Sequence, residues 1–171
     1  MELYFLRHGL AGQHGDPKYK DDSLRPLTAE GVEKMHRESL GMKALDLKFD
    51  CILSSPYLRA RQTAETVAKI YNIKKEDIHL TENLLEPACA KELLAEIRRR
   101  FPKKEHFLLV GHEPHLTELI SSFLESGKEL MIDLKKGGLC SLSLHEPWDD
   151  PDAVLNWLLT PSQLTCMGQA G

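Results

Sequence analysis

Two histidines and two arginines stand where short apolar runs end or where the following helical patterns begin: Arg7, His8, Arg59 and His112. A phosphoryl group in transfer carries negative charge on its equatorial oxygens, so a catalyst needs cationic donors around it and a nucleophile in line with the leaving group. Arg7, Arg59 and His112 can donate to those oxygens. The neutral imidazole of His8 is a competent nucleophile near pH 7, and a phosphohistidine is reactive enough to be hydrolysed in a second step. These residue types therefore indicate phosphoryl transfer through His8.

Short apolar runs alternate with helical patterns along the chain, as in an α/β fold. Strands are predicted at residues 2–7, 49–53, 78–80, 107–110, 140–144 and 155–160, and helices behind Thr28, behind Pro56, over 93–101 and behind Pro114. The alternation at 140–144 favours a half-exposed antiparallel strand, whereas the run at 107–110 is typical of a parallel strand covered on both faces. Because the carboxyl ends of parallel strands gather at one edge of a sheet, His8, Ser55 and His112 should meet there. The tail from Ser162 to Gly171 shows no periodicity and stays unassigned.

The length and composition fit a single domain that spans residues 1–171. The chain has 42% hydrophobic and 28% charged residues, with a formal net charge of -4. This charge gives no bulk electrostatic reason to expect nucleic acid or an acidic membrane as a partner. The four cysteines form no C-x-x-C pair, and the sequence shows no signal-peptide core and no apolar segment of membrane-spanning length. We therefore expect reduced thiols and a cytoplasmic protein.

Other reaction classes find less support in the sequence. His106, His112 and His115 are close together, but the string His-Glu-Pro-His is not the zinc-binding H-E-x-x-H motif, and Pro114 would begin a helix between the last two. The chain contains neither a G-x-S-x-G nucleophile elbow nor a G-x-x-x-x-G-K-S/T phosphate loop. We therefore expect no metal and no other cofactor, because an electropositive pocket can hold an anion without one.

Three motifs resemble the histidine phosphatase superfamily, branch 1, in order and spacing: Leu6-Arg7-His8-Gly9, Ser54-Ser55-Pro56 running into Leu58-Arg59-Ala60-Arg61-Gln62-Thr63-Ala64-Glu65, and Gly111-His112. Two further segments are similar to the small bacterial phosphohistidine phosphatases of the SixA type: Arg25-Pro26-Leu27-Thr28 and Thr160-Pro161-Ser162-Gln163-Leu164. The resemblance covers nearly the whole chain. It implies a phosphoglycerate mutase-like α/β fold with three αβα layers, in which a mostly parallel six-stranded sheet has one antiparallel strand.

The same resemblance implies roles for the candidate residues. His8 would attack through Nε2. The phosphoryl group would be bound by Arg7, Arg59, His112 and Gly9. The expected substrate is a phosphohistidine on a protein, such as a phosphotransfer domain or carrier, and the expected product is inorganic phosphate. The loop over residues 10–25 is expected to border the pocket, with no contact assigned to any of its residues.

The general acid decides which class of phosphate the site hydrolyses. A phosphomonoester expels an alkoxide, so a positioned acid is worth about 10² to 10⁴ in rate, whereas a phosphohistidine expels an imidazole that needs little proton assistance. The resemblance to phosphomonoesterases points to Glu86 as a possible acid, and Glu82 and Glu113 are further candidates. Two alternatives therefore stay open, namely a small-molecule phosphomonoesterase that uses Glu86, and a catalytically silent module that recognises phosphate. The short segment between Arg59 and His112 leaves little chain for a lid, which favours an open site and a protein substrate.

Overall fold

A six-stranded sheet forms the centre of the computed structural model, which describes residues 1–87, 89–124, 131–149 and 151–169. The strands are β1 (Glu2–Arg7), β2 (Cys51–Ser54), β3 (Ile78–Leu80), β4 (His106–Gly111), β5 (Leu139–His145) and β6 (Asp152–Leu159). Their order in the sheet is β3-β2-β4-β1-β5-β6. Neighbouring strands pair in parallel except where β5 pairs with β1 and with β6, so β5 is the antiparallel strand among them. The predicted fold class is confirmed.

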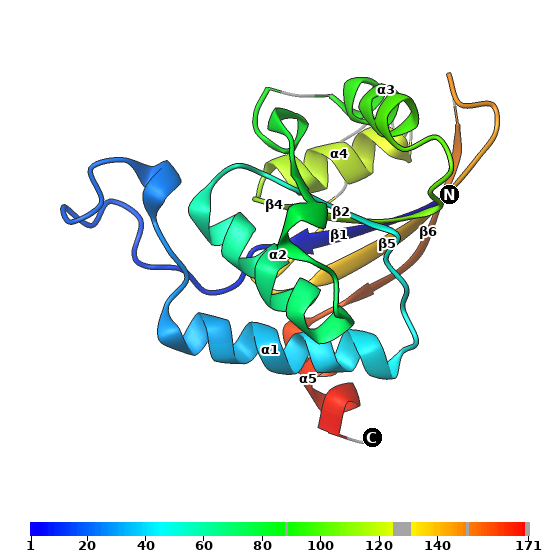
Figure 1. Cartoon of the computed structure of the whole chain (residues 1–171). Coiled ribbons are helices and arrows are strands. Elements are labelled where there is room, and N and C mark those ends of the chain that lie inside the picture. The colour runs from blue at the N-terminus through cyan, green and yellow to red at the C-terminus, as the bar shows by residue number, and fades with distance from the viewer. Residues whose placement is uncertain (88, 125–130, 150, 170–171) are drawn as a thin grey trace.

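Helices cover both faces of this sheet (Figure 1). One face carries α3 (Ala90–Arg100) and α4 (His115–Phe123), and the other carries α1 (Ala29–Ala44), α2 (Leu58–Tyr71) and α5 (Pro161–Gln169). Successive side chains of a strand point to opposite faces. Leu3 and Phe5 accordingly pack into the core beneath α3 and α4, while Tyr4 and Leu6 pack into the core beneath the other helices. Both faces of the parallel strands are therefore buried, as the continuous apolar runs predict.

Local sequence signals explain where the helices nearest the site begin. Thr28 caps α1, because its hydroxyl accepts the N–H of Gly31 at 2.9 Å. Ser55 lies between β2 and α2, and its hydroxyl accepts the N–H of Tyr57 at 3.3 Å. Thr28 thereby satisfies a backbone donor that the start of α1 leaves free, whereas Ser55 holds the backbone of Tyr57, the residue just before α2.

Two predicted patterns differ from the structure. Val32, which the helical spacing placed on the buried face of α1, is 43% exposed, whereas Met35 and Met42 are buried. Strand β5 is almost fully buried rather than half-exposed, because β1 and β6 pair with both of its edges and helices cover the sheet. Ser141 of this strand is only 1% exposed. An alternating pattern therefore did not mean an exposed face here.

Residues 162–169 of the unassigned C-terminal tail belong to α5, which lies against α1 (Figure 1). A Cβ atom at Gly41 of α1 would come within 1.8 Å of the carbonyl oxygen of Leu164, so the two backbones approach as closely as only glycine allows. Leu164 is fully buried in the contact. This helix is held by one buried leucine and a close backbone approach, which apolar periodicity could not reveal.

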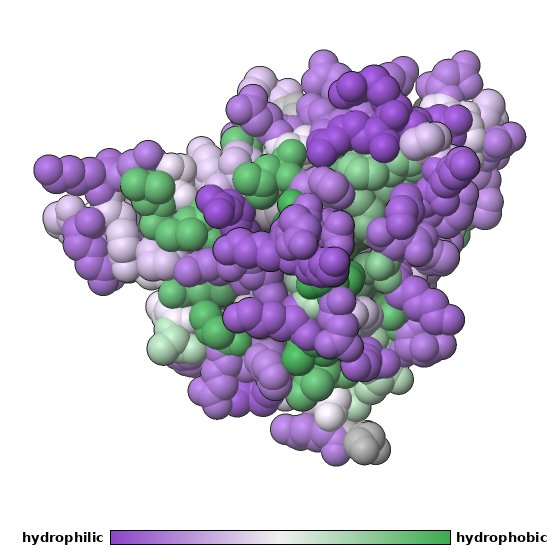
Figure 2. Space-filling view, in the orientation of Figure 1, coloured by the Kyte–Doolittle hydropathy of each residue, from purple (hydrophilic) through white to green (hydrophobic). Residues whose placement is uncertain are grey.

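The face shown in Figure 2 is mostly hydrophilic, and its apolar residues appear in small separate areas. No helix in the described part of the chain is long and apolar enough to cross a membrane. The four cysteines are free thiols, as expected: Cys51, Cys89, Cys140 and Cys166.

Candidate active site

The carboxyl ends of three neighbouring strands bring His8, Ser55 and His112 together, as the sequence predicts. Strand β4 lies between β2 and β1. The backbone N–H of His8 donates to the carbonyl of Gly111 at 3.0 Å, and that of Ser55 donates to the carbonyl of Val110 at 2.9 Å. The rings of His8 and His112 lie 5.1 Å apart between centroids. The sheet itself therefore sets the distance between the two imidazoles.

The side chain of His8 is buried and oriented by its own neighbour. Only 5% of His8 is exposed, and its Nδ1 lies 2.8 Å from the carbonyl oxygen of Gly9. Because a carbonyl can only accept a hydrogen bond, Nδ1 carries the proton and Nε2 keeps its lone pair, to which Arg59 Nε donates at 3.3 Å. Burial, followed by the charges of Arg59 and Arg7, lowers the pKa of His8 to about 3. His8 is thus a neutral imidazole whose Nε2 lone pair is free of a proton at neutral pH.

Gly9 supports His8 instead of lining the pocket. Its N–H donates to the hydroxyl of Thr63 at 3.0 Å, and that hydroxyl donates in turn to the carbonyl of Arg59 at 2.8 Å. Gly9 is absent from the residues that line the pocket around His8. Its N–H is already used within the protein, so the structure does not bring Gly9 into position as the substrate-binding group that the sequence suggested. Thr63, a residue inside the predicted motif on α2, joins the turn after β1 to the helix that carries Arg59.

His112 is held by Ser55 from the neighbouring strand end. Its Nε2 lies 2.8 Å from the Ser55 hydroxyl, and its Nδ1 is buried without a hydrogen-bond partner in the described chain. The same hydroxyl accepts the N–H of Tyr57, so its own proton is free for His112 Nε2. Burial, and then the proximity of His8 and Arg59, lower the pKa of His112 to about 2. His112 is therefore neutral, and Nδ1 is the nitrogen left to carry its proton.

Arg7 is anchored by the loop that precedes β5. Its Nη1 donates to the carbonyl of Leu134 at 2.8 Å, its backbone carbonyl accepts the N–H of Gly137 at 3.0 Å, and its own N–H donates to Gly138 at 3.2 Å. The Nε atom is buried and has no hydrogen-bond partner among the described residues. Arg7 lines the same pocket as His8. One side of its guanidinium is thus fixed, and the other nitrogens remain for a ligand.

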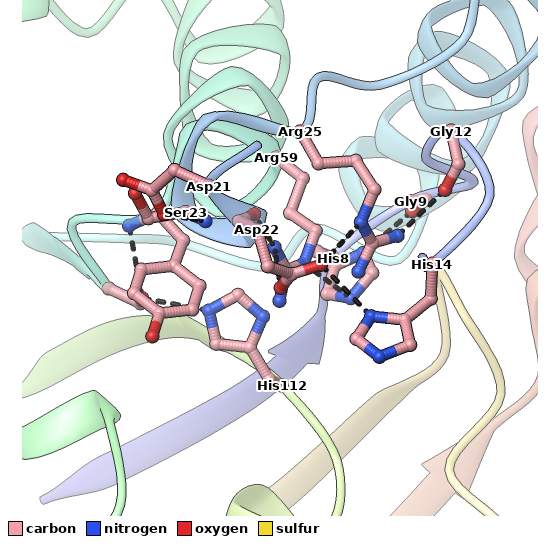
Figure 3. A network of polar contacts seen from close by, with 12 residues as sticks. His8, Gly9, Gly12, His14, Asp21, Asp22, Ser23, Arg25, Arg59 and His112 are labelled. Atoms are coloured by element: carbon pink, nitrogen blue, oxygen red, sulfur yellow. Dashed lines mark hydrogen bonds and ion pairs between the residues drawn. The ribbon is translucent and has the colours of Figure 1, made fainter. Parts of the chain in front are cut away.

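Asp22 joins Arg59 and Arg25 at the pocket, as Figure 3 shows. Arg59 Nη1 donates to the backbone carbonyl of Asp22 at 2.8 Å and lies 3.0 Å from its carboxylate, while Arg25 Nε donates to that carboxylate at 2.8 Å. His14 Nδ1 lies 3.0 Å from the same group. Burial opposes ionisation, but hydrogen bonds from Arg25 and His14 and the charge of Arg59 hold the pKa of the Asp22 carboxyl well below its usual range.

Sequence reasoning assigned no contact to these loop residues. Arg25 belongs to the segment Arg25-Pro26-Leu27-Thr28, on which part of the family resemblance rests, so the sequence did contain a signal for this residue. Asp22 had no such signal, and neither had Lys136, which also lines the pocket, because each lies in a loop whose path is set by the packed chain. The loop over residues 10–25 borders the pocket, as expected, because His14, Asp22 and Arg25 are among the residues that line the pocket.

A pocket of about 600 Å³ opens over His8 and is lined by the basic groups described above. Four of its lining residues are those that the sequence singled out, and they come from the ends of β1 and β4 and from the start of α2: Arg7, His8, Arg59 and His112. Arg25 and Lys136 add two further cations. The pocket can therefore hold a multiply charged anion against the unprotonated Nε2 of a neutral histidine.

Comparison with protein families agrees with this geometry. Residues 3–91, more than half of the chain, match the model of the histidine phosphatase superfamily, branch 1. The chain belongs to this superfamily. As a histidine phosphatase it is a hydrolase that acts on phosphoryl groups, which agrees with the chemistry inferred from His8 and the arginines.

Two relatives and one solved structure resemble this histidine phosphatase over most of its length. An uncharacterized protein of Picosynechococcus is 36% identical over 145 residues, which cover 83% of this chain and 84% of the relative. The phosphohistidine phosphatase SixA of Escherichia coli is 25% identical over 166 residues, which cover 96% of both chains. A structure of the protein histidine phosphatase SixA complexed with tungstate has a TM-score of 0.80 at 23% identity, covering 96% of this chain and 99% of that one. The last likeness supports the fold.

The acidic candidates of this histidine phosphatase lie in different surroundings. Glu86 is exposed and is not among the residues that line the pocket. Glu113 does line it. Its Oε2 accepts the hydroxyl of Thr117 at 2.6 Å, and its Oε1 is buried without a hydrogen-bond partner among the described residues. Burial raises the pKa of Glu113 above its usual value. The acid that the sequence favoured is therefore outside the pocket, and the one beside His112 is inside it.

The three histidines considered as metal ligands have separate partners. His106 Nδ1 lies 3.0 Å from the carboxylate of Asp50, His112 contacts Ser55, and His115 Nε2 lies 3.4 Å from the carbonyl of Asn83. Within the described residues, no three His, Cys, Asp or Glu side chains are grouped so that they could hold a metal ion.

Proposed function

We propose that this protein hydrolyses a phosphohistidine carried by another protein, through a phosphohistidine intermediate on His8. The similarity to SixA of Escherichia coli over 96% of the chain supports this substrate. The geometric observation that carries the proposal is the neutral, oriented His8 in a pocket of cations, with Glu86, the acid that the sequence favoured, outside that pocket. A leaving imidazole needs little proton assistance, so such a pocket suits it.

In the first step the lone pair of His8 Nε2 attacks phosphorus, a P–N bond forms, and the P–N bond to the imidazole of the substrate breaks. The departing imidazole takes a proton from water. The hydrogen bond from Nδ1 to the carbonyl of Gly9 keeps Nε2 directed at the phosphoryl group throughout. Arg59 Nε, which donates to Nε2 in the free protein, turns its hydrogen bond to a phosphoryl oxygen. In the second step water attacks phosphorus, the bond to Nε2 breaks, and inorganic phosphate leaves, while the proton that the attacking water loses neutralises the hydroxide left by the first step.

The surrounding donors stabilise the charge that spreads over the phosphoryl oxygens. Arg7 and Arg59 both line the pocket and present planar cationic donors, and neutral His112 donates through Nδ1. Because these groups are already fixed by Leu134, Asp22 and the Ser55 hydroxyl, little reorganisation is needed when charge develops. Loss of one such donor typically costs about 10² to 10³ in rate.

One observation favours a second candidate, a small-molecule phosphomonoesterase. Glu113 lines the pocket beside His112, and its raised pKa favours the protonated form that a general acid requires. In that reaction Glu113 would give its proton to the leaving alkoxide, the role that the sequence had suggested for Glu86.

The deciding experiment supplies a phosphohistidine peptide and p-nitrophenyl phosphate in parallel, in the presence of a chelator. The proposal predicts faster turnover of the peptide and at most a twofold effect of Glu86→Gln or Glu113→Gln on it. Comparable turnover of both substrates, with the ester alone lost in Glu113→Gln, would replace the proposal by the second candidate. Binding of phosphate without turnover of either substrate would instead indicate a silent recognition module, and complete inactivation by chelator would contradict a metal-free reaction.

A further inference from the structure

A second cavity, of about 500 Å³, lies between α1, α5 and the loop that contains Lys136. We call it the α1–α5 groove. Leu10 and Lys136 line both this groove and the pocket over His8, so the two spaces adjoin. Each space alone falls within the volume range of a site for a small ligand. An occupant that fills both is therefore larger than a typical metabolite, and its phosphoryl group can lie at His8 while the rest extends over Lys136.

The groove presents basic side chains that are available to a ligand. Lys34, Arg37 and Lys136 line it. Lys34 pairs with Glu30 at 2.6 Å and Arg37 pairs with Glu33 at 2.9 Å, each one turn earlier on α1, and these two glutamates are 61% and 70% exposed. Exposed pairs of this kind contribute only about 0.3 to 0.5 kcal/mol, so both cations can turn toward a bound anion. Lys136 has no ion pair with another described residue.

The carboxyl group of the groove does not cancel this positive charge. Glu38 is only 4% exposed, and its Oε2 is buried without a hydrogen-bond partner in the described chain. A Cβ atom at Gly137 would lie 2.3 Å from that oxygen, so the carboxyl is packed directly against the loop that anchors Arg7. Burial raises the pKa of Glu38 to about 8, against the opposing charges of Lys34 and Arg37. At neutral pH Glu38 is mostly protonated, and the groove is basic.

We propose that the α1–α5 groove binds an acidic segment of the same protein that presents a phosphohistidine to His8. This inference rests on the proposed function and names a feature of its substrate. An anionic occupant suits Lys34, Arg37 and Lys136, and it can belong to the protein that carries the phosphorylated residue because the two spaces adjoin.

The test compares two phosphohistidine peptides of equal length, one with Asp and Glu flanking the phosphohistidine and one with Asn and Gln, with phosphoramidate as a small reference substrate. We expect the wild-type protein to prefer the acidic peptide by about tenfold in kcat/KM at low salt, and we expect high salt to reduce this preference. The double variant Lys34→Glu/Arg37→Glu should abolish the preference. The milder Lys34→Gln/Arg37→Gln should reduce it, and serves if charge reversal impairs folding.

The matched control is Lys48→Glu/Lys69→Glu, which makes the same change in charge at exposed positions that line neither space. It should keep the wild-type preference. Equal kcat/KM for the two peptides, or an unchanged preference in both groove variants, overturns the groove proposal and leaves the proposed function intact. Failure to hydrolyse either peptide, with p-nitrophenyl phosphate still turned over, overturns the proposed function and the groove proposal with it.

Discussion

Ser55→Ala tests whether the neighbouring strand end orients His112. The hydroxyl of Ser55 is fully buried and lies 2.8 Å from His112 Nε2, so its removal leaves that nitrogen without a partner. A buried group left unsatisfied in this way costs about 1 to 3 kcal/mol of stability. Without the Ser55 hydroxyl, His112 is also no longer held in the tautomer whose protonated Nδ1 donates to the phosphoryl group. Losing an orienting bond of about 1 to 1.5 kcal/mol lowers kcat/KM by about tenfold.

Ser54→Ala is the matched control for this variant. Ser54 is also fully buried, but its hydroxyl donates to the carbonyl of Ser55 at 2.9 Å and does not contact His112. Urea unfolding should show a loss of stability in both variants, and steady-state hydrolysis of a phosphohistidine peptide should show the activity loss in Ser55→Ala alone. Ser55→Thr keeps the hydroxyl and should recover part of the activity. Wild-type kcat/KM in Ser55→Ala, or an equal loss in Ser54→Ala, would refute the role given to Ser55.

Three further predictions concern pH and packing. The pKa values of His8 and His112, lowered to about 3 and about 2, predict a kcat/KM that stays level from pH 8 down to about pH 5, so a limb near pH 6.5 would contradict them. Because the pKa of Glu38 is raised to about 8 in the folded protein, the free energy of unfolding should fall as pH rises from about 4.5 to 8. The slope should reach up to about 1.4 kcal/mol per pH unit in urea unfolding, and Glu38→Gln should remove it. An unchanged pH dependence in Glu38→Gln would show that another group causes it. Gly41→Ala should lower the stability by about 1 to 3 kcal/mol despite the better helix propensity of alanine, because the new Cβ meets the carbonyl of Leu164, and a stabilised variant would contradict this contact.

The sequence predicts the parts of this molecule that regular secondary structure controls. His8 and His112 follow directly on apolar strands, and parallel pairing of β1 with β4 brings those strand ends together. Arg59 lies in the first turn of α2, whose small apolar residues pack on the sheet. Strand and helix periodicity, together with the rule that the carboxyl ends of parallel strands meet at one edge of a sheet, therefore suffices to predict that the main residues of the pocket lie together.

The remaining parts depend on loops and on close packing that periodicity does not encode. Asp22 reaches Arg59 only because a loop folds back over α2, and the sequence of that loop has no repeating pattern. Glu86 and Glu113 are both glutamates before a proline, so residue type could not separate them, and only the chain path makes one exposed and the other pocket-lining. The helix α5 depends on the glycine contact at Gly41.

A rapid-quench experiment with a labelled phosphohistidine peptide tests the phosphoryl transfer to His8 most directly. Under single-turnover conditions the label should appear on the protein before phosphate is released, in an acid-labile and alkali-stable form, and it should map to Nε2 of His8. His8→Ala should form no such label and should lose turnover. Full turnover by His8→Ala, or release of phosphate with no label on the wild-type protein at any time, would contradict the covalent reaction.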